Sequence, residues 1–121
     1  MPLKVLVIDS DESILEVMEM IITGSGYAFL QSGIPATPEE IALLGPDVIL
    51  IEDQLDGNGK GRKISTAVKK SALTYSIPVI LMTTRNTADG IMRESEADAL
   101  LVKPFDIARL EELLCRFSGN A

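Results

Sequence analysis

The sequence predicts a five-stranded, doubly wound parallel α/β domain over residues 1–121. Continuous apolar segments alternate with segments of helical periodicity five times along the chain. Strands that are buried on both faces have this continuous apolar character, and the intervening helices cover both faces of a parallel sheet through right-handed crossovers. The sequence contains no internal repeat, low-complexity tract or linker, so we interpret it as one domain, long enough to bury a core without disulfides.

The first half of the chain predicts two strand–helix pairs. Strands are predicted where apolar and β-branched residues are consecutive, and helices where apolar residues recur every three or four positions before a glycine. In the second helix, Pro38 lies in the first turn and Gly45 follows the end, which are the favoured places for these residues. The predicted elements are a strand at 3–9, a helix at 11–26, a strand at 27–32 and a helix at 37–45. The expected buried face of the first helix contains Ile14, Val17, Met18, Ile21 and Ile22.

The second half predicts three strands and three helices. The segment DVILIEDQLDG at 47–57 contains the third strand, whose four apolar residues are followed directly by Glu52 and Asp53. The other predicted elements are a helix at 62–72, a strand at 77–84, a weaker helix at 87–96 that contains Gly90, a strand at 97–103 and a helix at 106–117. The expected buried faces are Ile64, Ala67, Val68 and Ser71 in the first of these helices, and Ile107, Leu110, Leu114 and Phe117 in the last.

Composition excludes several classes of function. The net charge of −7 argues against nucleic-acid binding by this domain, because phosphate contacts require clustered Lys and Arg. The absence of histidine removes the usual general base and the usual nitrogen ligand of zinc sites. No apolar run is long enough to span a membrane. The single cysteine, Cys115, cannot form an internal disulfide, so we expect a cytoplasmic protein.

Polar side chains follow four of the five predicted strands at their carboxyl ends, where doubly wound sheets place their functional sites. Carboxylates in such a position suit a hard cation such as Mg²⁺, and a lysine with a hydroxyl suits phosphoryl oxygens. The candidate residues are Asp9, Ser10 and Asp11 after the first strand, Glu52 and Asp53 after the third, Thr83 and Thr84 after the fourth, and Lys103 after the fifth.

Four motifs occur in the order found in a known family. They are KVLVIDSDESI (4–14), PDVILIEDQLDG (46–57), IPVILMTT (77–84) and ADALLVKPF (97–105). In these motifs the chain resembles the response-regulator receiver domains of two-component signalling, the chemotaxis-receiver-like family, over essentially its full length. The resemblance implies a flavodoxin-like strand order of 2-1-3-4-5. It also implies a role in a phosphorelay, in which a histidine kinase supplies a phosphoryl group to an aspartate that ends the third strand.

The resemblance assigns roles to individual residues. It implies Mg²⁺ bound by the acids after the first strand, here Asp9 and Asp11. It implies that Thr83 and Lys103 support the phosphoryl group, and that the peptide bond between Lys103 and Pro104 is cis. We expect Asp9, Glu52, Thr83 and Lys103 to converge around one small pocket.

Four positions depart from the family pattern, one of which is Asp56, where a proline is expected after the third strand. The other three concern the phosphoryl site and its switch. Glu52 stands where the acceptor aspartate is expected, Ser10 where a second acid is expected, and Leu100 where an aromatic switch residue is expected. The extra methylene of glutamate displaces its oxygens, and a misplacement of ~1 Å can slow a reaction on the order of a hundredfold. Serine removes a negative charge from a site that would bind Mg²⁺ through charged oxygens. A leucine at position 100 is expected to stay packed in one position rather than to switch.

Glu52 and Asp53 should point to opposite faces, because successive side chains of a strand do so. If Glu52 faces the site, it is expected to be a permanent anion near Lys103, and Asp53 is expected to be a solvated loop acid. A local bulge would reverse the two assignments.

The leading hypothesis is a degenerate receiver, an interaction module rather than an enzyme, with impaired phosphorylation and at most weak Mg²⁺ binding. A histidine kinase or an output protein would dock on the face of residues 87–117, and homodimerisation through this face stays open. One alternative is a working receiver that accepts phosphoryl at Asp53 or Glu52. A second is a small flavodoxin-like nucleotide- or flavin-binding enzyme, which the acidic turn of Asp9, Asp11 and Glu12 disfavours because it would repel phosphates.

Overall fold

The computed structural model describes residues 2–32, 37–55, 59–84 and 95–118, and it contains a five-stranded parallel sheet in the order β2-β1-β3-β4-β5. The strands are β1 (Lys4–Ile8), β2 (Ala28–Gln31), β3 (Val48–Glu52), β4 (Val79–Thr83) and β5 (Ala99–Val102). The central pairing places Ile51 of β3 beside Ile8 of β1 and Leu81 of β4. The strand order and the parallel pairing confirm the predicted doubly wound sheet.

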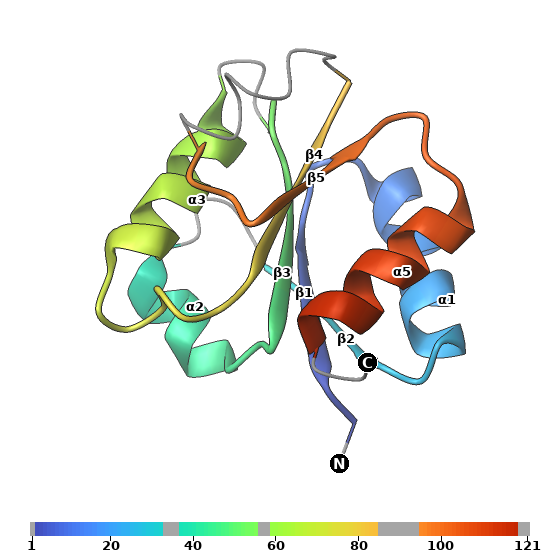
Figure 1. Cartoon of the computed structure of the whole chain (residues 1–121), viewed down its shortest axis with the longest axis horizontal. Helices are drawn as coiled ribbons and strands as arrows, with labels where there is room; N and C mark the ends of the chain where they lie inside the picture. Colours follow the sequence, from blue (N-terminus) through green and yellow to red (C-terminus); the bar gives the residue numbers. More distant parts are fainter. Residues whose placement is uncertain (1, 33–36, 56–58, 85–94, 119–121) are drawn as a thin grey trace.

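Helices cover both faces of this sheet (Figure 1). On one face lie α1 (Glu12–Gly24) and α5 (Ile107–Ser118), and on the other lie α2 (Pro38–Leu44) and α3 (Lys60–Lys70). The predicted helix at 87–96 falls outside the described residues except for its last two positions. Within the described ranges, no helix combines the length and apolar character that crossing a membrane would require.

Each strand supplies alternate side chains to two apolar cores. In β3, Val48 and Leu50 belong to the core that contains residues of α1 and α5, whereas Ile49 and Ile51 belong to the core that contains residues of α2 and α3. We call these the α1/α5 core and the α2/α3 core. All four side chains are fully buried. Because both faces of β3 are packed, the register of the strand is restricted, and with it the face on which each residue at the end of the strand lies.

The helix ends follow local rules that the sequence contains. The Asp11 carboxylate caps α1 by accepting hydrogen bonds from the backbone N–H groups of Ser13 and Ile14 at 2.9 and 3.4 Å. Thr37 and Glu40 form a capping box at the start of α2. Gly45 ends α2 in the left-handed conformation, with φ of 63°. The predicted positions of Pro38 and Gly45 are confirmed.

The helical faces differ from the prediction at their edges. Ile107 of α5 is 55% exposed, and Leu113 is buried in the core instead. Val17 of α1 is also exposed. In α3, Ser65 takes the buried position expected for Ala67, and its hydroxyl donates to the backbone carbonyl of residue 95 at 2.8 Å. A helix that packs on a sheet buries only part of its apolar surface, so the periodicity locates the helix but not the limits of its buried stripe.

Candidate functional site

The polar residues at the carboxyl ends of the strands form two clusters, one on each face of the sheet. Asp9, Glu52 and Lys103 continue the side-chain alternation of the α1/α5 core, and we call them the lysine cluster. Asp53 and Thr83 continue the alternation of the α2/α3 core. With Arg62 of α3 they form what we call the arginine cluster.

The lysine cluster contains two carboxylates and one ammonium group. Lys103 Nζ donates a hydrogen bond to Glu52 Oε2 and lies 3.9 Å from Asp9 Oδ2. Only 14% of the Glu52 side chain is exposed, and Asp9 is buried. Opposite charges at this depth attract more strongly than at the surface because water screens them less. The cluster therefore holds the Glu52 carboxylate at the end of β3, where Lys103 neutralises its charge.

Asp9 is the buried acid of the lysine cluster, and its pKa is shifted. Burial raises the pKa of the Asp9 carboxyl above its ordinary value of 3.8. The backbone N–H of Asp11, which donates to Asp9 Oδ1 at 2.9 Å, and the charge of Lys103 act to lower this pKa, and the charge of Glu52 acts to raise it. Asp9 Oδ2 is buried and has no hydrogen-bond partner among the described residues. Ionisation of Asp9 is therefore less favourable in the folded protein than in the unfolded chain.

We expect Asp9→Asn to stabilise the protein at neutral pH, and this gain to shrink as the pH falls toward 3.8. Because the pKa of Asp9 is raised in the folded state, this carboxyl ionises first in the unfolded chain as the pH rises above 3.8. The free energy of unfolding of the wild type therefore decreases with pH until the folded-state pKa is passed. Asparagine cannot ionise, and its carbonyl still accepts from the Asp11 N–H. Urea denaturation at a series of pH values measures the difference, with Glu39→Gln, at an exposed position of α2, as the control. A difference between variant and wild type that is independent of pH would contradict this expectation.

Ser10 and Asp11, the neighbours of Asp9, are both engaged by the fold. The Ser10 hydroxyl donates to the backbone carbonyl of Leu55 at 2.9 Å, so it ties the first strand's end to the segment after β3. The Asp11 carboxylate caps α1, a use of this acid that the sequence analysis did not foresee. The signal for it was present, because an aspartate directly before a helical segment is a favoured N-cap.

The lysine cluster offers few charged oxygens to a Mg²⁺ ion. Mg²⁺ requires near-octahedral oxygen coordination. Asp9 Oδ2 has no hydrogen-bond partner among the described residues, but Glu52 is held by Lys103. In the described ranges no three Asp, Glu, Cys or His side chains are grouped closely enough to hold a metal ion. Among the described residues, the donor set of this cluster is thus poorer than a carboxylate-rich site would need.

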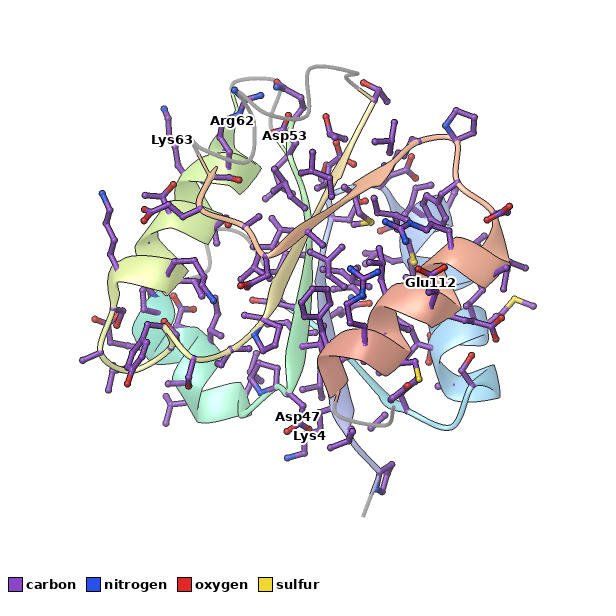
Figure 2. All side chains as sticks on the ribbon, in the orientation of Figure 1. Lys4, Asp47, Asp53, Arg62, Lys63 and Glu112 are labelled. Carbon is purple, nitrogen blue, oxygen red and sulfur yellow. The ribbon has the colours of Figure 1, made fainter. Side chains whose placement is uncertain are left out.

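Asp53 corrects one expectation from the sequence. It is not a solvated loop acid, because its side chain is fully buried. Arg62 binds it in a two-point contact, with Nε 2.7 Å from Oδ1 and Nη2 2.8 Å from Oδ2. The Gln54 amide and the Thr83 hydroxyl also donate to Oδ2, at 3.3 and 3.5 Å. Asp53 does point away from Glu52, but it points into the α2/α3 side of the sheet, where Arg62 supplies the opposite charge (Figure 2).

Gly61 allows α3 to approach β3 closely enough for this contact. A Cβ atom at position 61 would lie 1.7 Å from the backbone oxygen of Glu52 and 2.9 Å from that of Asp53. The Gly61 N–H instead donates to the Asp53 carbonyl at 3.1 Å. The helix therefore starts against the end of β3, and Arg62 follows within its first turn. The sequence analysis missed Arg62, although a basic residue in the first turn of the helix after an acidic strand end was an available signal.

Leu100 and Lys103 occupy the places expected in β5 and after it. Leu100 is half-buried and packs against the α2/α3 core. The peptide bond between Lys103 and Pro104 is cis, as predicted. The proposed roles of Asp9, Asp11, Glu52, Thr83, Lys103 and Leu100 in a phosphoryl site stay predictions.

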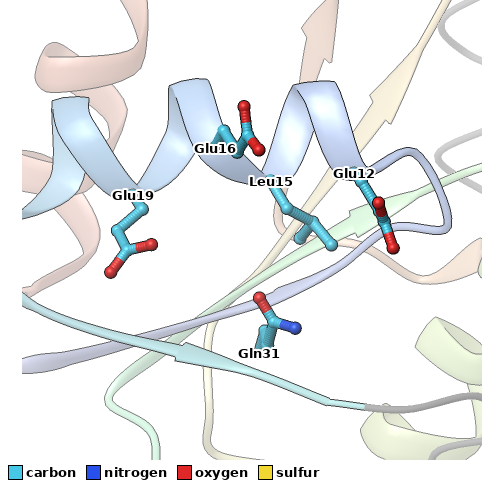
Figure 3. Close-up of a pocket in the computed structure, with 5 residues that line it drawn as sticks. All are labelled: Glu12, Leu15, Glu16, Glu19 and Gln31. Atoms are coloured by element: carbon cyan, nitrogen blue, oxygen red, sulfur yellow. The ribbon is translucent and has the colours of Figure 1, made fainter.

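A hollow of about 200 Å³ lies between α1 and β2 and is lined mainly by acids. Figure 3 shows Gln31 of β2 opposite Leu15 of α1, with Glu12, Glu16 and Glu19 along the helix. Like charges at this spacing repel one another and repel anions. This hollow therefore disfavours a phosphate-bearing ligand, as does the acidic turn beside it.

Comparison with known proteins matches residues 5–115 to the response regulator receiver domain. Among curated proteins, the chain is 29% identical over 121 residues to the phosphate regulon transcriptional regulatory protein PhoB of Pseudomonas aeruginosa, with 93% of this chain and 52% of that protein covered. It is 28% identical over 117 residues to the DNA-binding response regulator MtrA of Mycobacterium leprae, with 93% of this chain and 48% of that protein covered. The chain thus spans about half the length of these relatives.

Solved structures share the fold. A putative response regulator from Chloroflexus aurantiacus superposes with a TM-score of 0.81 at 23% identity, over 98% of this chain and 99% of that one. The receiver domain of the sensor histidine kinase PA1611 from Pseudomonas aeruginosa, which has a magnesium ion coordinated in its active site cleft, superposes with a TM-score of 0.79 at 18% identity, over 98% and 99% of the two chains. Together with the family match over nearly the whole sequence and the observed strand order, these likenesses lead to one conclusion: the chain belongs to the response regulator receiver domain family.

Proposed function

We propose that this receiver domain has an impaired phosphorylation switch and acts as an interaction module in two-component signalling. The observation that supports the proposal is the ion pair between Lys103 and Glu52, the residue that the family resemblance aligns with the acceptor. Glu52 already supplies there part of the negative charge that a phosphoryl group would bring. Receiver domains are signalling modules, and we propose no enzymatic activity for this one.

The geometry of Glu52 disfavours it as an efficient acceptor. Phosphoryl transfer depends on the in-line placement of the attacking oxygen and on neutralisation of the transferred charge. Glutamate is one methylene longer than aspartate, and one of its oxygens is bound directly to the lysine. A displacement of ~1 Å is enough to cost on the order of a hundredfold in rate.

The alternative acceptor, Asp53, is disfavoured for a different reason. Its side chain is fully buried, and both oxygens are bound by the Arg62 guanidinium. An attacking carboxylate oxygen has to be reachable by the phosphoryl donor. Acceptance at Asp53 would require the buried ion pair to open, which leaves charges uncompensated inside the protein.

We also propose that Mg²⁺ binds this domain weakly. Ser10 offers a neutral hydroxyl, already bonded to Leu55, where a second acid would supply a charged ligand. The Asp11 carboxylate is used as the cap of α1.

The partner surface that we propose is the face formed by β5 and α5, within residues 95–117. Val102 and Ile107 are 37% and 55% exposed there, and Phe105 lies half-buried between them in the sequence. Exposed apolar side chains of this kind are typical of protein-binding surfaces. The partner would be a histidine kinase, an output protein or a second copy of the chain. Residues 87–94 of the predicted face lie outside the described residues.

Incubation of the native protein with acetyl phosphate, followed by intact-mass and tandem mass spectrometry, tests the proposal. We expect no phosphorylated species at times when a receiver domain with an aspartate acceptor, treated in parallel, is largely modified. A phosphoryl group on Glu52 or Asp53 at a comparable rate would show a working receiver instead, and the fragment masses would identify the acceptor.

A further inference from the structure

Arg62 connects three elements of the fold through the arginine cluster. It belongs to α3, its guanidinium binds Asp53 after β3, and Asp53 accepts a hydrogen bond from Thr83 at the end of β4. The backbone adds a second link between these strands, because the Asp53 N–H donates to the Met82 carbonyl at 2.8 Å. The side chains of Asp53 and Thr83 are both buried.

The guanidinium determines the orientation of the Asp53 carboxylate. Its planar fork matches a carboxylate at two points, at 2.7 and 2.8 Å, so both the position and the rotation of the carboxylate are restricted. A buried carboxylate without a partner would be strongly unfavourable, so the Asp53 side chain has little freedom to leave this cation. Asp53 Oδ2 is consequently held where the Thr83 hydroxyl can donate to it.

Thr83 lies at the junction with the lysine cluster. Its backbone carbonyl accepts from the Lys103 N–H at 2.7 Å, so the two residues are neighbours across β4 and the end of β5. The Thr83 hydroxyl nevertheless bonds to Asp53, on the face of the sheet that carries the α2/α3 core. The hydrogen bond that this hydroxyl donates, at 3.5 Å, is therefore to a residue outside the lysine cluster.

We propose that Arg62 is a positioning residue that, acting through Asp53, fixes the Thr83 hydroxyl on the α3 side of the sheet. In the impaired receiver proposed above, this contact keeps the end of β4 in a single state. That consequence rests on the proposed function, whereas the positioning of Thr83 by Arg62 does not.

The rotamer of Thr83 provides the readout. In threonine-labelled protein, the three-bond couplings of the Thr83 γ-methyl carbon report its χ1 angle, and Thr83→Ser assigns the signal. We expect a single rotamer in the native protein. In Arg62→Met these couplings should move toward the averaged values of a freely rotating side chain. Lys63→Met is the matched control, because it removes the same charge from the next residue of α3, which is exposed and lies on the outer side of the helix (Figure 2).

A double variant tests the link from Asp53 to Thr83 in a protein that keeps no unpaired buried charge. Asp53→Leu/Arg62→Met removes both charges together, which preserves a folded protein better than removing one of them. Because Arg62 acts on Thr83 only through Asp53, the rotamer of Thr83 should also become averaged in this variant, which lacks Asp53. A native Thr83 rotamer in the folded double variant, or an equal change in Lys63→Met, would overturn the proposal. None of these measurements involves phosphoryl transfer, so their outcome is distinct from that of the acetyl phosphate experiment.

Discussion

Gly61→Ala is expected to destabilise the protein by about 3 kcal/mol or more, or to prevent folding, because overpacking against backbone atoms cannot be relieved by side-chain motion. The new Cβ would lie 1.7 Å from the Glu52 carbonyl oxygen, far inside van der Waals contact. The start of α3 would have to retreat from β3. Arg62 would move with it, so the two-point contact with the buried Asp53 would weaken as well.

Gly24→Ala is the matched control. Gly24 is the last residue of α1, and a Cβ atom there would meet no atom within 4 Å. We expect this variant to be neutral or to gain about 0.5–1 kcal/mol, because alanine restricts the unfolded chain and favours helix. Urea denaturation of both variants measures the two effects. Similar changes in the two proteins would show that α3 does not depend on the absence of a side chain at position 61.

Ser10→Asp/Glu52→Asp is expected to accept phosphoryl from acetyl phosphate at position 52 on the order of a hundredfold faster than the native chain. The shorter side chain withdraws the carboxylate from its direct contact with Lys103 and places an oxygen where in-line attack is favourable. The new acid beside Asp9 adds a charged ligand to the site. The rate is measured by intact-mass spectrometry with Mg²⁺ present, and tandem spectra locate the modified residue.

Ser10→Asp/Glu52→Gln is the control for the acceptor. It has the same net charge as the native chain and carries the same new acid, but it has no carboxylate at position 52. We expect no phosphorylation of this variant. Phosphorylation of Asp53 in it would mean that the buried pair with Arg62 opens readily, and our assignment of the acceptor position would be wrong.

The single variant Ser10→Asp tests the metal site. We expect Ser10→Asp alone to bind Mg²⁺ at least ~10-fold more tightly than the native protein, because a hard cation prefers a charged oxygen to a neutral hydroxyl. Calorimetric or fluorescence titration gives both dissociation constants. Tighter binding by the native protein would contradict the interpretation that Ser10 weakens the site.

The sequence by itself determined the sheet and the side of the sheet to which its strand-end residues belong. Continuous apolar segments alternating with helical ones are compatible with few topologies, since crossovers are right-handed and both faces must be covered. The two-residue period of a strand separates Glu52 from Asp53, and the structure shows this separation. The same period, applied to β4, also places Thr83 on the side of Asp53, although the sequence analysis grouped it with Lys103.

Only the tertiary structure decided which partner each acid has. Arg62 is nine positions from Asp53 in the sequence, and Thr83 is 30 positions from it. Neither spacing predicts a contact, because the contact depends on how closely α3 approaches the end of β3. That approach is possible because Gly61 has no side chain to hold the two backbones apart. A glycine in a loop-like segment can permit a turn or a close approach of two backbones, and only the positions of the neighbouring atoms show which of the two applies.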